Sequence, residues 1–183
     1  LILGPPMFTP TFSGIPCAKS AIFVDINVNS FRAQFQPITK INMEFSLRES
    51  MRLVRTDRMS MRWGEMDSLA HMNNVAYLRY FEESRVAWFN DLEIDYQSES
   101  EGPILGTISC RYLKSAVYPA TFMVTSYVGK LGRSSFVMYH QLTNCMEESE
   151  IYAEAEAVLV WADIAAGKSR PLPDWFRAVI QGE

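Results

Sequence analysis

The sequence is poor in the residues that mark several common classes of protein. It has only three cysteines, Cys17, Cys110 and Cys145, and no Cys-x-x-Cys pair, which argues against a disulfide scaffold and against a zinc site. It has only two histidines, and the second of them, His140, lies in a predicted strand and is assigned no function. We therefore expect no metal site, and a reducing compartment, the cytoplasm, as the location of the protein.

Long apolar runs and an excess of basic charge are also missing. No stretch approaches the roughly 18 consecutive apolar residues that cross a bilayer, and the opening run 1–3 is too short for the apolar part of a secretory signal. Seventeen basic residues against twenty-one acidic ones give a net charge of −4, and no segment gathers Lys and Arg into a stripe. These features predict a soluble protein that binds neither membranes nor nucleic acid.

The first fifty residues differ in composition from the rest. They hold five of the nine prolines, several Ser and Thr, and no apolar pattern longer than the run 21–24. We expect residues 1–50 to be a poorly ordered N-terminal extension. An over-extended reading frame would also explain this segment, because the sequence starts at Leu1 while Met43 and Met51 stand just before the patterned region. Residues 51–183 are expected to form one domain.

One long helix and five strands are predicted in this domain. Residues 74–92 contain no Pro or Gly and repeat apolar side chains with helical spacing. One helix followed by a run of strands indicates an α+β fold with an antiparallel sheet. A short terminal helix within 171–182 is expected to pack Trp175, Phe176 and Ile180 back on the sheet. Alternating patterns and turn formers predict strands over 56–65, 104–115, 121–130, 134–143 and 150–161.

The last predicted strand and the long helix have complementary faces. Three alanines share one face of the strand, because side chains alternate along it, and they leave room for something bulky. The helix offers large side chains along one stripe, at i, i+4, i+7 and i+11. We therefore expect the sheet to wrap around the helix, with this stripe as core. The residues are Ala153, Ala155 and Ala157 on the strand, and Tyr77, Phe81, Ser84 and Trp88 on the helix.

A turn rich in acid, imidazole and amide groups joins the first predicted strand to the long helix. Its carboxylate, Asp67, would activate water or attack a carbonyl carbon. The unpaired backbone N–H groups at the start of the helix, together with the helix dipole, would hold the negative charge that develops on the carbonyl oxygen. An Asp before a helix is also common as a turn residue, and Asn73 has the position of an N-cap.

This turn resembles the active loop of the hotdog-fold thioesterases, especially the 4-hydroxybenzoyl-CoA thioesterase-like group, whose loop commonly reads Asp-x-x-Gly-His-x-Asn-Asn. The matching residues are Asp67, His71, Asn73 and Asn74. A related string occurs in plant-type acyl-acyl-carrier-protein thioesterases. The resemblance runs from about residue 53 to 163 and implies a hotdog fold, in which an antiparallel five-stranded sheet is wrapped around one long central helix.

The resemblance also implies the chemistry. Asp67 would be the catalytic carboxylate, either as general base or as nucleophile through a mixed anhydride, and the backbone N–H of Asn74 would bind the thioester carbonyl. His71 would orient the carboxylate, donate to the thioester, or only bond a loop carbonyl. The substrate would be an acyl-CoA or an acyl-carrier-protein thioester, so no separate cofactor is expected. Hotdog proteins usually pair at their open edge, which predicts a homodimer or homotetramer.

Five residues are predicted to bind the substrate. Asn73 and Tyr77 stand at the start of the helix, and Lys130, Arg133 and Ser134 lie in a turn that resembles the family's hairpin near the coenzyme arm. Arg binds phosphate through a fork and Lys binds it as a point charge, so this turn suits the phosphates of coenzyme A. Charged turns are also common on any protein surface.

The sequence departs from the family's pattern at two positions. Ala70 stands where Gly is common, and a positive φ there would strain a residue with a Cβ, so the loop is expected to take a slightly different path. Glu65 stands where many relatives carry Asp, which we expect to be a mild change. Glu82 and Glu83 on the helix are an alternative source of the catalytic acid, although ion pairs would also explain them.

Two other classes of function remain open. A hotdog hydratase would add water to a 2-enoyl thioester, but its usual motif places the Asp and His differently. A noncatalytic acyl-CoA sensor would bind the thioester with the same helix, usually beside a DNA-binding extension, and residues 1–50 show no helix-turn-helix pattern.

Overall fold

The computed structural model describes residues 51–94 and 100–183, so the extension predicted over 1–50 lies outside the described residues. Two α-helices and six strands are found in this part of the chain, and none of its helices is long and apolar enough to cross a membrane. In chain order the elements are β1 (Arg52–Ser60), a 3-10 turn η2 (Trp63–Glu65), α2 (Asn74–Asp91), β2 (Glu101–Tyr112), β3 (Thr121–Leu131), β4 (Ser135–Asn144), β5 (Ile151–Asp163), β6 (Lys168–Ser169) and α3 (Asp174–Gln181).

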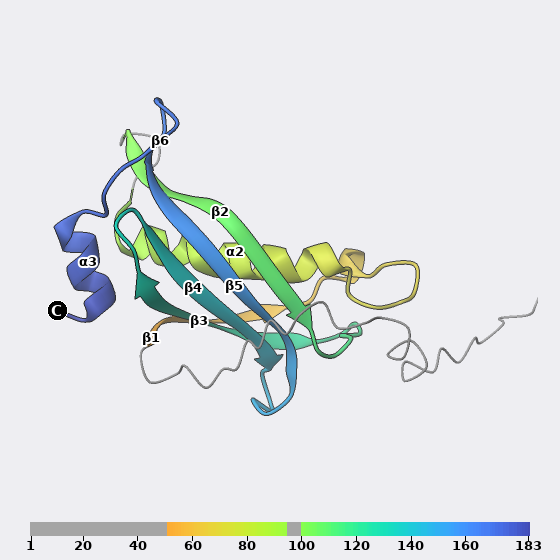
Figure 1. The fold of residues 1–183 in the computed structure, drawn as a ribbon. Coiled ribbons are helices and arrows are strands. Elements are labelled where there is room, and N and C mark those ends of the chain that lie inside the picture. The colour runs from red at the N-terminus through yellow and green to blue at the C-terminus, as the bar shows by residue number, and fades with distance from the viewer. Residues whose placement is uncertain (1–50, 95–99) are drawn as a thin grey trace, which may run out of the picture. The chain divides into compact units, whose positions relative to one another are not determined.

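The strands form one antiparallel sheet in the order β1-β3-β4-β5-β2 (Figure 1). A sixth strand, β6, pairs with β5 through Ala162↔Ser169 and Asp163↔Lys168. The sequence predicts only five strands, because a two-residue strand is too short to show an alternating pattern. It forms where the chain turns back through Gly167, whose φ of 62° suits a residue without a Cβ.

The first strand ends earlier than predicted. The alternating pattern suggests a strand up to residue 65, whereas β1 stops at Ser60 and the chain then turns through η2. The turn is held locally, because the Arg62 N–H donates to the Glu65 carboxylate at 2.7 Å and the Glu65 N–H donates to the Arg62 carbonyl at 3.1 Å. Paired local hydrogen bonds of this kind compete with sheet pairing and are not visible in an apolar pattern.

Helix α2 matches its predicted bounds to within one residue. It begins where the Asn73 side chain accepts a hydrogen bond from the Val75 N–H, and it lies across one face of the sheet (Figure 1). The predicted stripe on the helix and the three alanines of β5 are all buried, which confirms the core assignment. The fold is thus α+β, with an antiparallel sheet and a helix packed on it. That the sheet encloses α2 as its one central helix stays a prediction, since α3 also contributes to the core.

The short helix α3 packs at the far end of the sheet from the start of α2. Phe176 and Ile180 are buried in the core, as expected, whereas Trp175 is 47% exposed and makes T-shaped ring contacts with Trp161 and Phe176. The Arg177 guanidinium donates to the carbonyl oxygens of Gly132 and Arg133 at 2.8 and 2.7 Å. These bonds attach α3 to the turn between β3 and β4.

A chain of polar groups crosses the core between α2 and the sheet. The Ser84 and Ser126 hydroxyls lie 2.9 Å apart, and the Ser126 hydroxyl lies 2.8 Å from Nδ1 of His140. The His140 ring stacks on Phe81, with ring centroids 5.4 Å apart, and is fully buried. Burial first, and the charge of Arg85 second, lower the pKa of His140 to about 3. The imidazole is therefore neutral at physiological pH.

Candidate functional site

The loop between β1 and α2 is closed on itself by backbone hydrogen bonds. The Asp67 N–H donates to the His71 carbonyl at 2.7 Å, and the Ala70 N–H donates to the Asp67 carbonyl at 3.1 Å. Met66 and Met72 pair as an isolated bridge on either side. The Met61 N–H donates to the Ala120 carbonyl at 2.8 Å, which attaches the start of this segment to the beginning of β3. The loop is therefore a defined turn with fixed ends.

The Asp67 carboxylate is half-buried and uses one of its two oxygens to hold the loop. Oδ1 accepts the N–H groups of Leu69 at 2.8 Å and of His71 at 3.3 Å. No hydrogen bond to Oδ2 is found among residues 51–94 and 100–183. The architectural role that the sequence allows for this residue is thus real, and it leaves the second oxygen for another partner.

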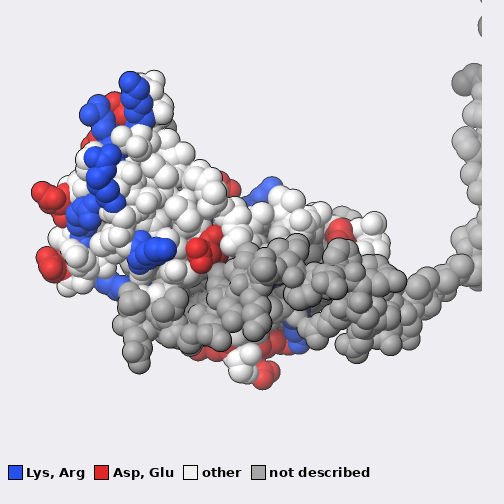
Figure 2. Space-filling model, in the orientation of Figure 1, with Lys and Arg blue, Asp and Glu red and all other residues white. Residues whose placement is uncertain are grey.

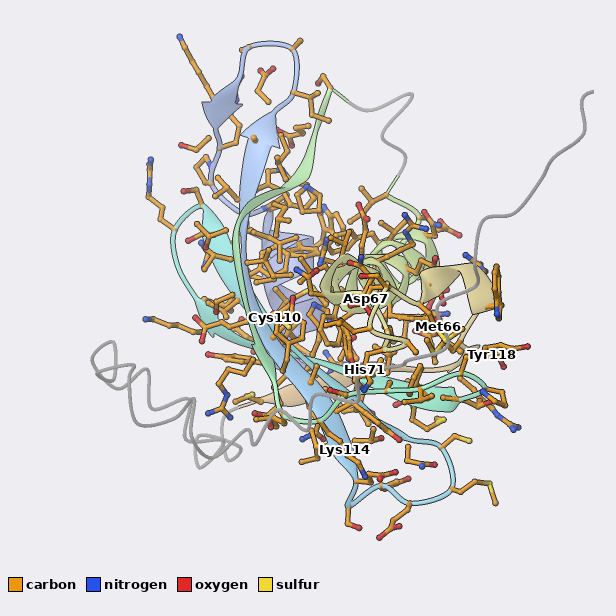
Figure 3. All side chains as sticks on the ribbon, turned by 90° about the vertical axis from the view of Figure 1, so that its right-hand side faces the viewer. Met66, Asp67, His71, Cys110, Lys114 and Tyr118 are labelled. Atoms are coloured by element: carbon orange, nitrogen blue, oxygen red, sulfur yellow. The ribbon has the colours of Figure 1, made fainter. Side chains whose placement is uncertain are left out.

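The start of α2 lies directly behind this loop. Figure 3 looks along the helix, and Asp67 and His71 lie on the loop that stands in front of its N-terminal end. Asn73 caps the helix as predicted, because its side chain accepts from the Val75 N–H at 2.9 Å and its carbonyl accepts from the Ala76 N–H at 2.9 Å. For the Asn74 N–H, the described part of the chain provides no acceptor. This N–H is the group to which the family resemblance assigns the thioester carbonyl.

A short segment after β2 packs against the first turns of α2. The Tyr77 hydroxyl donates to the Lys114 carbonyl at 3.3 Å and accepts from the Ala116 N–H at 3.1 Å. The Tyr112 hydroxyl donates to the Asn74 carbonyl at 3.1 Å. Burial raises the pKa of Tyr77, so its hydroxyl stays protonated. Tyr77, predicted to bind substrate, therefore acts at least as a buried tie between the helix and this segment.

The side chains of His71 and of the two alternative acids are exposed, unlike that of Asp67. The backbone of His71 holds Asp67, whereas its side chain is exposed. Glu82 and Glu83, the alternative acids, are exposed on α2. No group of three metal-ligating side chains occurs within the described ranges.

Ala70 adopts the conformation that the family's glycine would favour. Its φ is 59°, so the loop keeps the left-handed turn instead of taking the different path that we expected. A left-handed conformation costs a residue with a Cβ about 1–2 kcal/mol, and the larger entropy of Gly in the unfolded chain offsets part of this.

We therefore expect Ala70→Gly to raise the free energy of unfolding by about 0.5–1 kcal/mol, measured by urea denaturation. Ala87→Gly, within α2, is the matched control and is expected to lower it by about 1 kcal/mol. A loss of stability in Ala70→Gly would contradict the strained loop.

The other predicted binding residues lie far from this loop in the same chain. Lys130, Arg133 and Ser134 are at the opposite end of β3 from Thr121, which pairs with Ser60. Lys130 lies nine residues further along the strand than Thr121, or about 30 Å at roughly 3.3 Å per residue. One chain therefore does not bring the two groups of residues together.

The hairpin lies in a basic part of the surface. Figure 2 shows Lys and Arg side chains, with some acids among them, gathered over the end of the molecule that carries β6 and α3. Lys130 and Arg52 line a cavity of about 430 Å³ there, with Val128 and Ile180 as apolar walls. The sequence pattern did not indicate Arg52, because only the pairing of β1 with β3 brings it beside this hairpin.

Known proteins of related sequence and structure carry the same domain. A family model described as the thioesterase-like superfamily matches residues 61–180. The PA2801 protein of Pseudomonas aeruginosa, provisionally described as a thioesterase, is 43% identical, with a TM-score of 0.67, covering 70% of this chain and 99% of that one. A Xanthomonas campestris protein provisionally described as an acyl-CoA thioesterase is 28% identical, with a TM-score of 0.60, covering 66% of this chain and 100% of that one.

A sequence relative of Bacillus subtilis, the uncharacterized protein YsmA, is 26% identical over 113 residues, which are 62% of this chain and 76% of that protein. The family model spans well over half of the chain and includes the loop, α2 and the strands β2 to β6. The resemblance to the hotdog-fold thioesterases is thus confirmed, and the chain belongs to the thioesterase-like superfamily.

Proposed function

We propose that this protein hydrolyses an acyl-CoA thioester, with Asp67 as the catalytic carboxylate and the N-terminus of α2 as the oxyanion site. One observation carries the proposal: a carboxylate with one oxygen unengaged by the described residues stands in the loop before a helix whose first N–H has no acceptor there. The provisional description of the Xanthomonas relative as an acyl-CoA thioesterase agrees with this substrate class.

The reaction follows from these two groups. The thioester carbonyl accepts a hydrogen bond from the Asn74 N–H, which draws electron density toward the oxygen. Oδ2 of Asp67 takes a proton from water while the water oxygen bonds to the carbonyl carbon. The tetrahedral oxyanion then collapses, the C–S bond breaks, and the leaving thiolate takes up the proton that Asp67 accepted from water, which restores the carboxylate. Direct attack by Asp67 would give a mixed anhydride and the same products after hydrolysis.

The edges of the sheet support a homodimer. The edge strand β1 carries Arg52, Arg55 and Arg58, and charged side chains of this kind discourage strand pairing. The other edge strand, β2, has no charged residue between Glu101 and Arg111 and exposes Ile104 and Leu105. We propose that two copies pair along β2, which leaves the charged edge free.

Antiparallel pairing along β2 would also complete the substrate site. The Tyr112 end of β2 lies beside the start of α2, because the Tyr112 hydroxyl bonds the Asn74 carbonyl. The Pro103 end lies beside the hairpin, since Pro103 pairs with Trp161 and the Trp161 N–H donates to the Ser134 carbonyl at 2.8 Å. Antiparallel strands place opposite ends together, so the hairpin of one copy would approach the loop of the other.

In this arrangement Lys130, Arg133 and Ser134 of the second copy would bind the phosphates of coenzyme A, as the sequence suggests. Arg52 joins them through the cavity that it shares with Lys130. The cations supply charge and the Arg forks supply direction for phosphate oxygens. Coenzyme A is part of the substrate, so the proposal requires no resident cofactor.

A thiol-release assay across aliphatic and aromatic acyl-CoAs tests the function. We expect release of free coenzyme A from at least one class, and binding without release from any of them would contradict hydrolysis. Crotonyl-CoA separates the hydratase, since water addition removes the enoyl absorbance without freeing a thiol. Faster release from acyl-carrier protein than from acyl-CoA would assign the carrier protein as the substrate.

A further inference from the structure

Glu65 links three parts of the candidate site. Its Oε2 accepts the Tyr80 hydroxyl of α2 at 2.6 Å and the N–H of Arg62, the residue that begins the 3-10 turn, at 2.7 Å. Its backbone carbonyl accepts the N–H of Asn73, the helix cap, at 2.8 Å. Asp67, two residues later, begins the closed loop. One residue thus connects the 3-10 turn, the helix cap and the middle of the helix.

The bond between Glu65 and Tyr80 is largely shielded from water. The Glu65 side chain is 9% exposed and Tyr80 is 4% exposed. Burial, and next the bond to Glu65, raise the pKa of Tyr80 well above its ordinary value, so the hydroxyl remains a donor. The Tyr80 hydroxyl also lies 3.3 Å from the Ser60 carbonyl. Hydrogen bonds to a charged group are worth about 1.5–3 kcal/mol, more than neutral ones, so this contact resists displacement of the loop from the helix.

We propose that Glu65 is a positioning residue that fixes the loop of Asp67 against the N-terminus of α2, and that it does so by reach, with its carboxylate bonded to Tyr80. This inference rests on the proposed function for its kinetic effect, although the contacts themselves do not depend on it. It differs from our expectation that Glu in place of the family's Asp is a mild change, and the kinetics below decide between the two. The additional methylene carries Oε2 from the turn to the helix, which a shorter side chain would not reach.

Two substitutions of Glu65 distinguish the length of its side chain from its charge. Both hydrogen bonds end on the same oxygen, Oε2, so the single amide oxygen of Gln would accept both in its place. Asp keeps the charge but is one methylene shorter. If the length of the side chain is what matters, Glu65→Gln retains the function of the residue and Glu65→Asp loses it.

Steady-state kinetics on the full chain with its best acyl-CoA tests the proposal. We expect Glu65→Asp and Tyr80→Phe each to lower kcat by about 10- to 100-fold, because a misplacement near 1 Å is enough for such a loss. KM should change by less than about threefold, since the binding contacts remain. Glu65→Gln should stay within about threefold of the wild type. The double variant Glu65→Asp/Tyr80→Phe should be no slower than either single one, because both remove the same contact.

The matched control is Tyr152→Phe, which removes a comparable hydroxyl bonded to Glu150 at 3.1 Å that makes no hydrogen bond to the loop. Its kcat should be unchanged, and a loss equal to that of Tyr80→Phe would overturn the proposal. A low kcat for Glu65→Gln would show that the charge of Glu65 matters. A kcat for Glu65→Asp equal to that of the wild type would show that the length of the side chain does not matter. Either result defeats the inference.

Amide hydrogen exchange distinguishes failure of this inference from failure of the proposed function. If the wild type released no thiol, hydrolysis would be refuted, and the contact could still be read at the Asn73 and Val75 amides. We expect their exchange to be faster in Glu65→Asp and unchanged in Glu65→Gln. Equal protection in both variants would show that the Glu65 side chain does not fix the helix cap.

Discussion

Replacing Asp67 by Asn is expected to lower kcat by about 10²- to 10⁴-fold, the range of general-base catalysis. The structure makes Asn the informative substitution. The amide oxygen of Asn can still accept the Leu69 and His71 N–H groups that Oδ1 accepts now, so the loop keeps its shape. The group lost is the second, proton-accepting oxygen. Thiol release under steady state, with thermal unfolding in parallel, measures the two effects separately.

The control for this prediction is Asp91→Asn at the end of α2. Asp91 pairs with Arg55 and has a side chain 61% exposed, so it should leave kcat unchanged. Full turnover by Asp67→Asn would refute the assignment of the carboxylate. A large fall in its melting temperature would instead point to the architectural role of Asp67 in the loop.

The stability of the protein is expected to fall as the pH decreases below about 6.5, because of His140. Burial lowers the pKa of His140 to about 3 in the folded protein, against 6.5 in the unfolded chain. Between these values the unfolded chain binds a proton that the folded protein does not bind. The free energy of unfolding is therefore highest above the unfolded pKa of His140 and decreases by about 1.4 kcal/mol per pH unit below it. Urea denaturation at pH 6.5, 5.5 and 5.0 measures this slope.

The variant His140→Met supplies the control. Met fills a similar volume beside Phe81, and Ser126 keeps its contact with Ser84, so the core retains most of its contacts. Its stability should vary less with pH than that of the wild type, by about 1.4 kcal/mol per unit between pH 6.5 and 5. Equal slopes in the two proteins would show that His140 takes up a proton without unfolding.

The sequence predicted which helices and strands form better than it predicted where they begin and end. Helix α2 and the strands β3 to β5 carry regular apolar patterns, and their observed bounds lie within a residue or two of the predicted ones. The prediction failed where local hydrogen bonds interrupt the pattern, as at the Arg62–Glu65 turn, and where a strand is too short to have one, as in β6. Periodicity reports which face is buried and contains no information about such bonds.

In the candidate site, too, local features were predicted from the sequence and long-range contacts were not. The order Asp67, His71, Asn73 and Asn74 predicted a capped helix behind a closed turn, because capping and turn formation depend on residues close in sequence. The roles of Glu65, Tyr80 and Arg52 could not be predicted. Tyr80 is fifteen residues from Glu65, and Arg52 reaches Lys130 only across a strand pair.

The sequence by itself determined the class of fold, the helix stripe facing the alanines, and the residues of the loop, since each follows from side-chain pattern and local geometry. Only the tertiary structure decided that Glu65 bonds the helix, that His140 is neutral within the core, and that the basic hairpin lies at the opposite end of β3 from the loop. Contacts between distant residues depend on strand order and register, and these are properties of the whole packed sheet.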